Sequence, residues 1–280
     1  MNYESTVATR CNNWYDVEFA FLSSPQSIQE AVDHGFNLFS LSNNHAEDCE
    51  NAENGIPGGL ATRNHMNQFS RNSNIQWHGV GEGAELTDVS VKTYASKGRT
   101  YKVAFAAVTF EGWDTSNTAR GEDDLHAEQI LENLKSAQVD VRILSIHTQG
   151  FFGNAKALAR KFISNYKGDI VFAEGPHTWA GVEAVAKNEG GYGVAFHGLG
   201  NFLHTQCSDN PDNLIGRVLL DKATLKPSQI QVIPVLNHFG GSVELVPSID
   251  SLPLANFTWQ TTTLSAHQKV PAAYFNLPSE

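Results

Sequence analysis

The chain has 280 residues, of which 41% are hydrophobic and 18% are charged, and this composition is typical of a globular protein rather than a disordered one. The net charge of −11 argues against nucleic acid or an anionic membrane surface as the main partner. No apolar run approaches the roughly 20 residues of a membrane helix. Residues 1–5 also lack the charged-then-apolar layout of a secretion signal, so the sequence indicates a soluble, untargeted chain and leaves its localisation unknown.

The three cysteines are widely spaced and contain no C-x-x-C pair, which argues against a cysteine zinc knuckle or a redox motif. Their odd number predicts reduced thiols. Cys49 lies four residues after His45, but a small buried thiol is a better interpretation of Cys49 than a metal ligand.

The first part of the chain is expected to contain a short strand, a helix and a second strand. Residues 1–15 are polar and are predicted to be irregular, whereas residues 16–22 are a short strand candidate. Ser24-Pro25 is typical of a helix N-cap followed by proline, so a helix is expected from there to about Asp33. Residues 37–41 are predicted to form an apolar strand.

The rest of the chain alternates helices and strands until its last third. Helices are expected over residues 58–71, 123–137 and 155–166. Strands are expected over residues 75–80, 89–94, 101–108, 141–146, 169–173 and 194–197. The strands predicted over 214–220 and 229–236 have no helix between them and therefore indicate an antiparallel pair.

This order of elements predicts an α/β fold. Strands that alternate with helices favour parallel pairing with the helices outside, and the last third adds a mixed sheet or a second sheet. The sequence contains no repeat and no low-complexity linker. We therefore predict one domain over residues 1–280, with a core of about 16–238 and a C-terminal extension over 239–280.

Three predicted strands each run into a histidine, and these junctions are the most informative feature of the sequence. The histidines are His45, His147 and His177, and Asn44 and Glu174 lie on the same strand ends. If the strands are neighbours, the imidazoles converge on one sheet edge, where α/β folds bind ligands. Imidazoles with amide or carboxylate oxygens suit zinc, manganese or iron. The alternative is three unrelated surface histidines among eleven.

Other motifs are weaker. The stretch Gly79-Val80-Gly81-Glu82-Gly83 resembles a dinucleotide-binding loop but lacks the full G-x-G-x-x-G pattern, so a plain glycine turn is the better interpretation. No G-x-S-x-G elbow is present, although a Ser-His-Asp set stays open.

The order of five motifs resembles the CapA family of bacterial capsule (poly-γ-glutamate) synthesis proteins, which are related to the calcineurin-like metallophosphatases. The motifs are Gly35-Phe36 through Asn43-Asn44-His45-Ala46 with Asp48; Gly79-Val80-Gly81; Ser145-Ile146-His147; Asp169-Ile170-Val171 with Pro176-His177; and Leu199-Gly200-Asn201-Phe202. The resemblance covers roughly residues 16–238. It implies two mixed β-sheets packed as a sandwich with flanking helices and a metal site at the strand ends.

The resemblance also implies roles for individual residues. Asn44 is expected to be a metal ligand, and His45 to protonate a leaving group or hold the transition state. His147 and His177 are expected to be ligands, and Asn201 to shape the floor of the pocket. Asp48 is assigned to the same pocket.

Three departures from the family pattern bear on this site. The family opens with a Gly-Asp strand and an Asn-Leu-Glu segment, neither of which is found before Asp16, so the first ligands are expected to be missing. Glu174 stands near the position of a family histidine and is expected to substitute as an oxygen ligand. Thr148-Gln149-Gly150 follows His147 where the family has Trp-Gly and an acid. Because two-metal sites need a bridging carboxylate, we expect one divalent zinc, manganese or iron ion, or none.

Three functions follow from these observations. The first is a metal-dependent hydrolase of phosphoester or polyglutamate-type substrates, with the capsule-synthesis machinery as a potential partner. The second is a non-catalytic polymer-binding or capsule-assembly protein with a degenerate metal site. The third is an unrelated sugar- or nucleotide-binding module, because the fold alone does not define a function. Family members often act at the cell surface, although this chain carries no signal that would send it there.

Overall fold

The computed structural model describes residues 1–96, 98–111, 116–203, 210–238, 242–245, 260–263 and 271–278. Its helices and strands form a mixed α/β fold, as predicted. The chain divides into two compact units, Met1–Leu158 and Ala159–Glu280. That residues 1–280 form a single domain stays a prediction. Within the described part of the chain, no helix is both long enough and apolar enough to cross a membrane.

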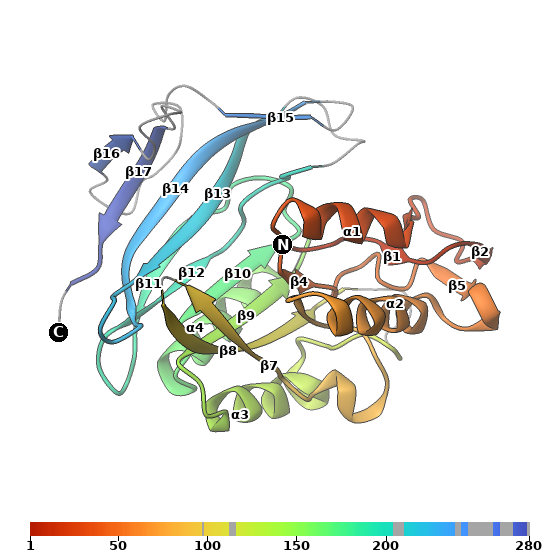
Figure 1. Ribbon diagram of the computed structural model, residues 1–280, viewed down its shortest axis with the longest axis horizontal. Coiled ribbons are helices and arrows are strands. Elements are labelled where there is room, and N and C mark those ends of the chain that lie inside the picture. Colours follow the sequence, from red (N-terminus) through yellow and green to blue (C-terminus); the bar gives the residue numbers. More distant parts are fainter. Residues whose placement is uncertain are drawn as a thin grey trace. The chain divides into compact units, whose positions relative to one another are not determined.

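Two helices and a parallel strand pair form the first core of the N-terminal unit (Figure 1). The helices are α1 (Pro25–Asp33) and α2 (Gly58–Asn72), and the strands are β4 (Leu38–Ser40) and β6 (Gln76–His78). Their fully buried apolar side chains include Ile28, Phe39 and Met66. Helix α1 begins with Pro25 after an extended Ser24, as the sequence predicted.

The N-terminal segment is ordered along β4, which corrects the expectation that residues 1–15 are irregular. The Met1 ammonium group donates to Leu38 O at 2.6 Å, and Tyr3 N donates to Ser40 O at 2.9 Å. The chain continues into β1 (Thr6–Val7), which pairs in parallel with β3 (Leu22–Ser23). Strand β2 (Cys11–Trp14) pairs with β5 (Cys49–Ala52), which is followed by a 3₁₀ turn at Glu53–Gly55.

The strand predicted over residues 16–22 is wrong, because only its last residue lies in a strand. The backbone N–H of Phe21 bonds to the Asp48 carboxylate at 2.6 Å instead of to a neighbouring strand. Phe19 is 52% exposed and so contributes no buried face. The apolar residues of this stretch therefore predicted a strand that the hydrogen bonds do not form.

A disulfide joins Cys11 of β2 to Cys49 of β5, with 5.7 Å between the Cα atoms. This bond corrects the prediction of reduced thiols, and it removes Cys49 from the candidate ligands, because a disulfide sulfur is not a thiolate. The two cysteines are 38 residues apart, so no local pattern indicated the pairing. Cys207 lies outside the described residues.

Glycines allow the start of α2 to approach a buried carboxylate. Glu47 is 3% exposed, and its Oε2 accepts a hydrogen bond from Gly59 N at 2.9 Å. A carboxylate at this position also interacts favourably with the positive end of the helix dipole. A Cβ added to Gly59 would lie 2.1 Å from Glu47 Oε1, so only glycine permits this contact.

We expect Gly59→Ala to lower the free energy of unfolding by about 1–3 kcal/mol, because the added methyl group displaces a buried, hydrogen-bonded carboxylate. The control is Gly153→Ala in the first turn of a later helix, where an added Cβ meets nothing within 4 Å. This control should raise stability by roughly 0.5–1 kcal/mol, because alanine favours the helix. Urea unfolding of both variants measures the difference, and equal effects would contradict the close-approach argument.

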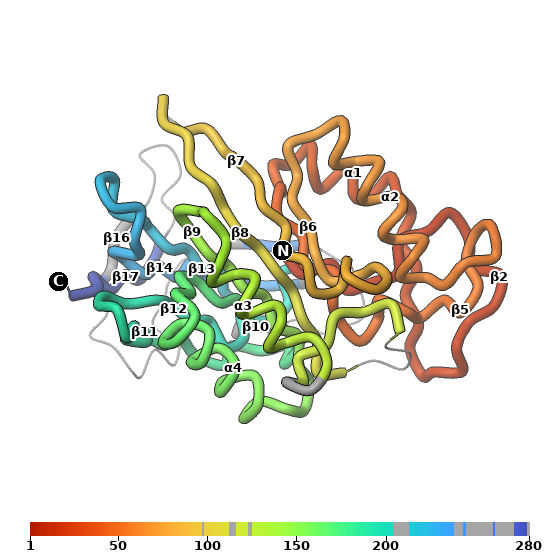
Figure 2. Tube along the Cα trace, turned by 90° about the horizontal axis from the view of Figure 1, so that it is seen from below, coloured from red at the N-terminus to blue at the C-terminus, as the bar shows by residue number. Residues whose placement is uncertain are grey.

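The second layer of the N-terminal unit consists of three neighbouring strands of a six-stranded mixed sheet, with a helix against them. Strands β7 (Ser90–Ser96) and β8 (Arg99–Thr109) form the predicted antiparallel hairpin, and β9 (Val141–His147) is parallel to β8. Figure 2 shows α3 (Glu128–Ser136) along β8. A π-helical turn at Asp123–Ala127 leads into α3, and a 3₁₀ turn at Gly83–Leu86 precedes β7. The register places Thr109 opposite His147, where both strands end.

The turn after β6 explains the Gly79-Val80-Gly81 motif by packing. Gly79 has φ +124°, and a Cβ there would lie 2.4 Å from Ser42 N. The motif therefore lets the chain after β4 pass close to the chain after β6.

His78 is buried between the two layers, and burial lowers its pKa to about 4. Its Nδ1 lies 2.9 Å from Ala107 N and 3.1 Å from Ala107 O. Between pH 6.5 and 4 the unfolded chain therefore takes up a proton at this residue that the folded chain does not.

We expect this histidine alone to lower the free energy of unfolding by roughly 3 kcal/mol as the pH falls from 6.5 to 4, since each pKa unit corresponds to about 1.4 kcal/mol. The replacement His78→Asn retains an acceptor near Nδ1 and cannot titrate in this range. Urea unfolding between about pH 7.5 and 4.5 should give a shallower pH dependence for the variant. The same slope in both proteins would show that His78 does not titrate as its burial requires.

The second unit is a sandwich of two mixed or antiparallel sheets, in agreement with the predicted fold class. The unit begins within helix α4 (Phe152–Asn165). Its first sheet layer contains β10 (Ile170–Glu174), β11 (Val182–Ala186) and β12 (Tyr192–Phe196). Strand β12 is parallel to β10 and antiparallel to β11. Strand β11 is not among the predicted strands, because its Val-Glu-Ala-Val-Ala stretch is short and half-buried.

The other layer of the sandwich contains the antiparallel pair predicted near the C-terminus. Its strands are β13 (Asn210–Leu220), β14 (Pro227–His238), β15 (Ser242–Leu245), β16 (Gln260–Thr263) and β17 (Pro271–Asn276). Side chains of both layers form one core, including Phe196 from β12 and Val232 from β14. Strands β15 and β17 both pair with β14, so the described parts of 239–280 extend this sheet.

Candidate functional site

The loop after β4 is tied to the N-terminal segment by one buried amide. Asn43 is 1% exposed, and its Nδ2 donates to Tyr3 O at 3.0 Å and to Asn2 Oδ1 at 3.2 Å. Its Oδ1 accepts a hydrogen bond from His45 N at 3.1 Å. Asn43 thus fixes the backbone that carries Asn44 and His45, a role that the sequence analysis did not assign.

A buried carboxylate orients His45. Asp48 is fully buried, and its Oδ2 accepts a hydrogen bond from His45 Nδ1 at 2.7 Å. The ring of Phe21 packs edge-on against the imidazole, with 4.4 Å between the ring centroids. An ionised carboxylate only accepts hydrogen bonds, so Nδ1 carries the proton and Nε2 is left to face Glu4, whose Oε1 lies 4.0 Å away.

His147 approaches the same carboxylate from the end of β9. Its side chain is fully buried, and its Nε2 lies 3.9 Å from Glu4 Oε1. The amide Nδ2 of Asn2 lies 3.3 Å from His147 Nδ1. The structure therefore brings His45 and His147 together around one oxygen of Glu4, although the two histidines are far apart in the sequence.

Asn2 and Glu4 are site residues that the sequence analysis missed. The segment Asn2-Tyr3-Glu4 has the Asn-x-Glu spacing of the family segment that was expected to be absent before Asp16, and it lies against both histidines. The expectation that the first ligands are missing stays a prediction. The signal was the Asn-x-Glu pattern itself, which lies in a short polar stretch without apolar periodicity.

Asn44 has the property expected of a metal ligand. Its Oδ1 is buried and accepts no hydrogen bond from any described residue. A buried amide oxygen in this state carries an uncompensated desolvation cost unless a cation, a water or a substrate takes the place of a donor. The described residues contain no group of three or more His, Cys, Asp or Glu side chains that could hold a metal ion. The donor types still suit a divalent cation, because Glu4, His147 and Asn44 supply a carboxylate, an imidazole and an amide oxygen.

The second unit holds the remaining predicted residues. His177 has φ +58°, an uncommon backbone conformation for a non-glycine residue, and its Nδ1 lies 2.7 Å from Asn201 Oδ1. Asn201 N donates to Oδ1 of the fully buried Asn213 at 2.8 Å. Glu174 ends β10 and is half-buried. The convergence of these residues with His45 and His147 stays a prediction.

Asn213 is a further residue that sequence reasoning missed. Gly200, which precedes Asn201 in the Leu-Gly-Asn-Phe motif, has φ +78°. A Cβ added to Gly200 would lie 2.0 Å from Asn213 Oδ1. The Leu-Gly-Asn-Phe motif therefore requires its glycine because a buried asparagine of β13 reaches that backbone. Nothing near position 213 in the sequence indicated this partner.

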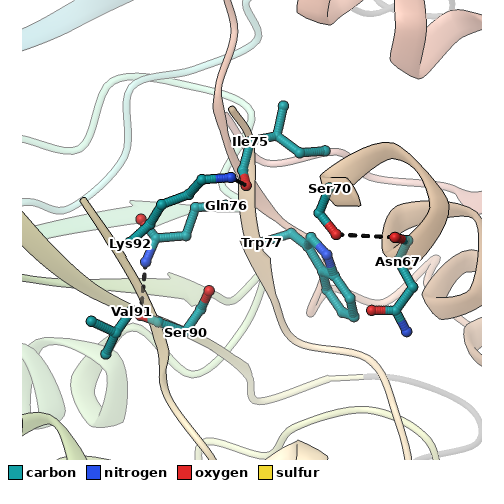
Figure 3. A pocket seen from close by; sticks show the side chains of 8 residues that line it. All are labelled: Asn67, Ser70, Ile75, Gln76, Trp77, Ser90, Val91 and Lys92. Carbon is teal, nitrogen blue, oxygen red and sulfur yellow. Dashed lines mark hydrogen bonds between the residues drawn. The ribbon is translucent and has the colours of Figure 1, made fainter. Parts of the chain in front are cut away.

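A separate pocket of about 360 Å³ lies between α2, β6 and β7 (Figure 3). None of the predicted site residues lines it. Gln76 Nε2 donates to Ser90 O at 2.7 Å, and Lys92 Nζ donates to Ile75 O at 2.7 Å. These polar side chains are already bonded to backbone carbonyl oxygens, so they are not available to bind a ligand. The better candidate for the functional site is the histidine cluster, by which we mean Glu4, His45 and His147.

Comparison with known proteins identifies the family. The model of the bacterial capsule synthesis protein PGA_cap matches residues 1–206, and the chain belongs to this family. The resemblance seen in the sequence is thereby confirmed, and the match includes the N-terminal segment that carries Asn2 and Glu4. A function associated with capsule or poly-γ-glutamate synthesis follows from this membership.

The other comparisons add little. No curated protein matches the chain. A crystal structure of a hypothetical protein from Thermus thermophilus is 14% identical, with a TM-score of 0.42 over 88% of this chain and 89% of that one. A likeness at this level carries no argument about function.

Proposed function

We propose that this capsule synthesis protein is a metal-dependent hydrolase of phosphoester or polyglutamate-type substrates. The observation that carries the proposal is the approach of His45 and His147 to one carboxylate oxygen, at 4.0 and 3.9 Å. The residue before His45, Asn44, adds a buried amide oxygen that accepts no hydrogen bond from the described residues. His147 ends strand β9, and Asn43 fixes the turn that carries Asn44 and His45, so these groups are held in the defined geometry that a catalytic site needs.

The proposed ligands of the cation in the N-terminal unit are Glu4, His147 and Asn44. His177 and Glu174 of the second unit are proposed as further ligands, and Asn201 as part of the pocket. A divalent zinc, manganese or iron ion at this position would activate water and polarise a phosphoryl or acyl oxygen. We propose a single ion, since the described residues offer no carboxylate that is evidently a bridge.

The proposed role of His45 follows from its partner. Asp48 accepts a hydrogen bond from Nδ1, so it fixes the tautomer and the orientation of the imidazole and leaves Nε2 for proton transfer. Nε2 of His45 faces Glu4, and when protonated it would donate its proton to the oxygen or nitrogen atom of the leaving group. Asn44 is proposed to contribute its amide oxygen from the adjacent position. Asn43 and Asn2 hold the two segments together and would not take part in the reaction.

The net charge of the chain bears on the substrate. An acidic polymer would be repelled by a protein of charge −11 unless the site itself is positive. Arg63 does not supply this charge, because Glu82 and Glu85 both accept from its guanidinium at 2.9 Å. A bound cation is therefore the simplest source of local attraction for a phosphoester or for polyglutamate.

We expect His147→Ala to weaken metal binding by about 10-fold or more, because changes even to groups around metal ligands cause losses of this size. Phosphodiester and poly-γ-glutamate hydrolysis should fall with it. The measurements are metal content of the purified protein, titration with Zn²⁺ and Mn²⁺, and rates with both substrates.

The matched control is His34→Ala, because His34 is an exposed histidine whose Nδ1 contacts Glu30 O at the end of α1. This variant should retain metal affinity and rates. No bound metal in the wild type together with identical rates for His147→Ala would eliminate the hydrolase.

The second candidate is a non-catalytic polymer-binding or capsule-assembly protein. The lack of a preformed group of three acidic, histidine or cysteine ligands among the described residues favours it. A wild-type protein that binds poly-γ-glutamate without turning it over in the same assay would support this candidate.

A further inference from the structure

The chain directly after His147 is held by a carboxylate from the neighbouring strand. Glu111 lies two residues beyond the end of β8. Its Oε1 accepts hydrogen bonds from Gln149 N and Gly150 N, both at 2.7 Å, and from Thr148 Oγ1 at 3.1 Å. Three donors on one oxygen, two of them from the backbone, fix residues 148–150 to the end of β8.

Glu111 is itself held firmly. Its backbone N donates to Thr109 Oγ1 at 3.1 Å, and its carbonyl oxygen accepts from that hydroxyl at 3.0 Å. Arg120 also donates to Glu111 O at 2.9 Å, and Glu122 in turn binds the Arg120 guanidinium. The carboxylate therefore extends from a fixed point of the backbone.

The same contacts reach His147. Phe110 N donates to His147 O at 3.1 Å, and Thr109 lies opposite His147 in the strand register. Because residues 148–150 continue the backbone of His147, the Glu111 carboxylate sets the direction in which the chain leaves this histidine. That direction decides whether Nε2 of the buried imidazole faces Glu4, 3.9 Å away.

The second carboxylate oxygen of Glu111 takes no part in holding the loop. Oε2 of Glu111 is buried and accepts no hydrogen bond from the described residues. All three hydrogen bonds to residues 148–150 therefore depend on the single oxygen Oε1.

We propose that Glu111 is a positioning residue of the histidine site, which acts by fixing residues 148–150 and thereby the direction of the His147 imidazole. This inference rests on the proposed function only in assigning a metal to His147. Glu111 also places a carboxylate against residues 148–150, although Thr148-Gln149-Gly150 contains no acidic residue of its own.

The test compares three variants of the full chain. Glu111→Ala removes the acceptor, whereas Glu111→Gln retains an oxygen that can accept the same hydrogen bonds. Asp140→Ala is the matched control, because Asp140 Oδ2 accepts Lys102 N at 2.8 Å near the opposite ends of β8 and β9. Each variant is measured by Zn²⁺ titration, by NMR of the His147 ring nitrogens and by urea unfolding.

We expect Glu111→Ala to weaken Zn²⁺ binding by about 10-fold or more and to shift the His147 ring signals. Glu111→Gln should restore most of the affinity, and Asp140→Ala should leave affinity and ring signals unchanged even if it lowers stability. Wild-type ring signals in Glu111→Ala overturn the inference, whatever happens to stability. If the wild type binds no Zn²⁺ but the ring signals of Glu111→Ala still shift, the proposed function fails and the positioning role stands.

Discussion

The replacement Lys187→Met is expected to lower the free energy of unfolding by about 3–5 kcal/mol, because it leaves a buried charge without its main partner. Asp169 is fully buried and Lys187 is 7% exposed, and the Lys187 ammonium group binds Asp169 Oδ1. Lys226 lies farther from the same oxygen, at 3.7 Å, and is half-exposed, so it can offset only part of the loss. Urea unfolding of the variant and the wild type measures the difference in the free energy of unfolding.

Two controls separate burial from charge. The pair Lys167–Glu189 is exposed on both sides, with 3.6 Å between its charged atoms, so Lys167→Met should cost no more than about 1 kcal/mol. The double variant Asp169→Leu/Lys187→Met removes both charges and should recover much of the loss of the single variant. Equal costs for Lys187→Met and Lys167→Met would show that the Asp169–Lys187 pair is not buried in solution.

Loss of the Cys11–Cys49 disulfide is expected to have an effect of similar size, about 4 kcal/mol, because the bond closes a loop of 38 residues in the unfolded chain. The variant is Cys11→Ser, compared with the wild type in unfolding experiments without reductant. Cys49 follows Asp48 directly, so the looser β2–β5 pair should also reduce the activity proposed for His45.

Thiol counting provides an independent check of this bond. The denatured wild type should present one reactive thiol without reductant, that of Cys207, and three after reduction. Three thiols in the unreduced protein would mean that the disulfide does not form.

The sequence predicted the elements whose signals are local. Ser24-Pro25 marked the start of α1, and the apolar run before His147 marked β9, because capping and burial act over a few neighbouring residues. Strands β1 and β2 gave no such signal. They are short and are defined by hydrogen bonds to residues far away in the chain, so polarity suggested an irregular segment.

The same distinction explains the outcome for the candidate site. His45 and His147 could be selected because each follows an apolar strand, which is visible in the sequence. Glu4 and Glu111 could not be selected in this way, because their importance depends on which strand ends lie side by side. Asn213 is the extreme case, since its amide supports Asn201 from a different sheet layer.

The position of Glu4 between His45 and His147 depends on the attachment of residues 1–3 to β4. The backbone hydrogen bonds of Met1 and Tyr3 to β4 bring Glu4 to both histidines, so local opening of these bonds would carry Glu4 away from them. Only the attached fraction of molecules could then bind a ligand, and the observed affinity would be reduced in proportion. A ligand that needs Glu4 should therefore slow hydrogen exchange at the amide of Tyr3 while leaving that of the central strands unchanged.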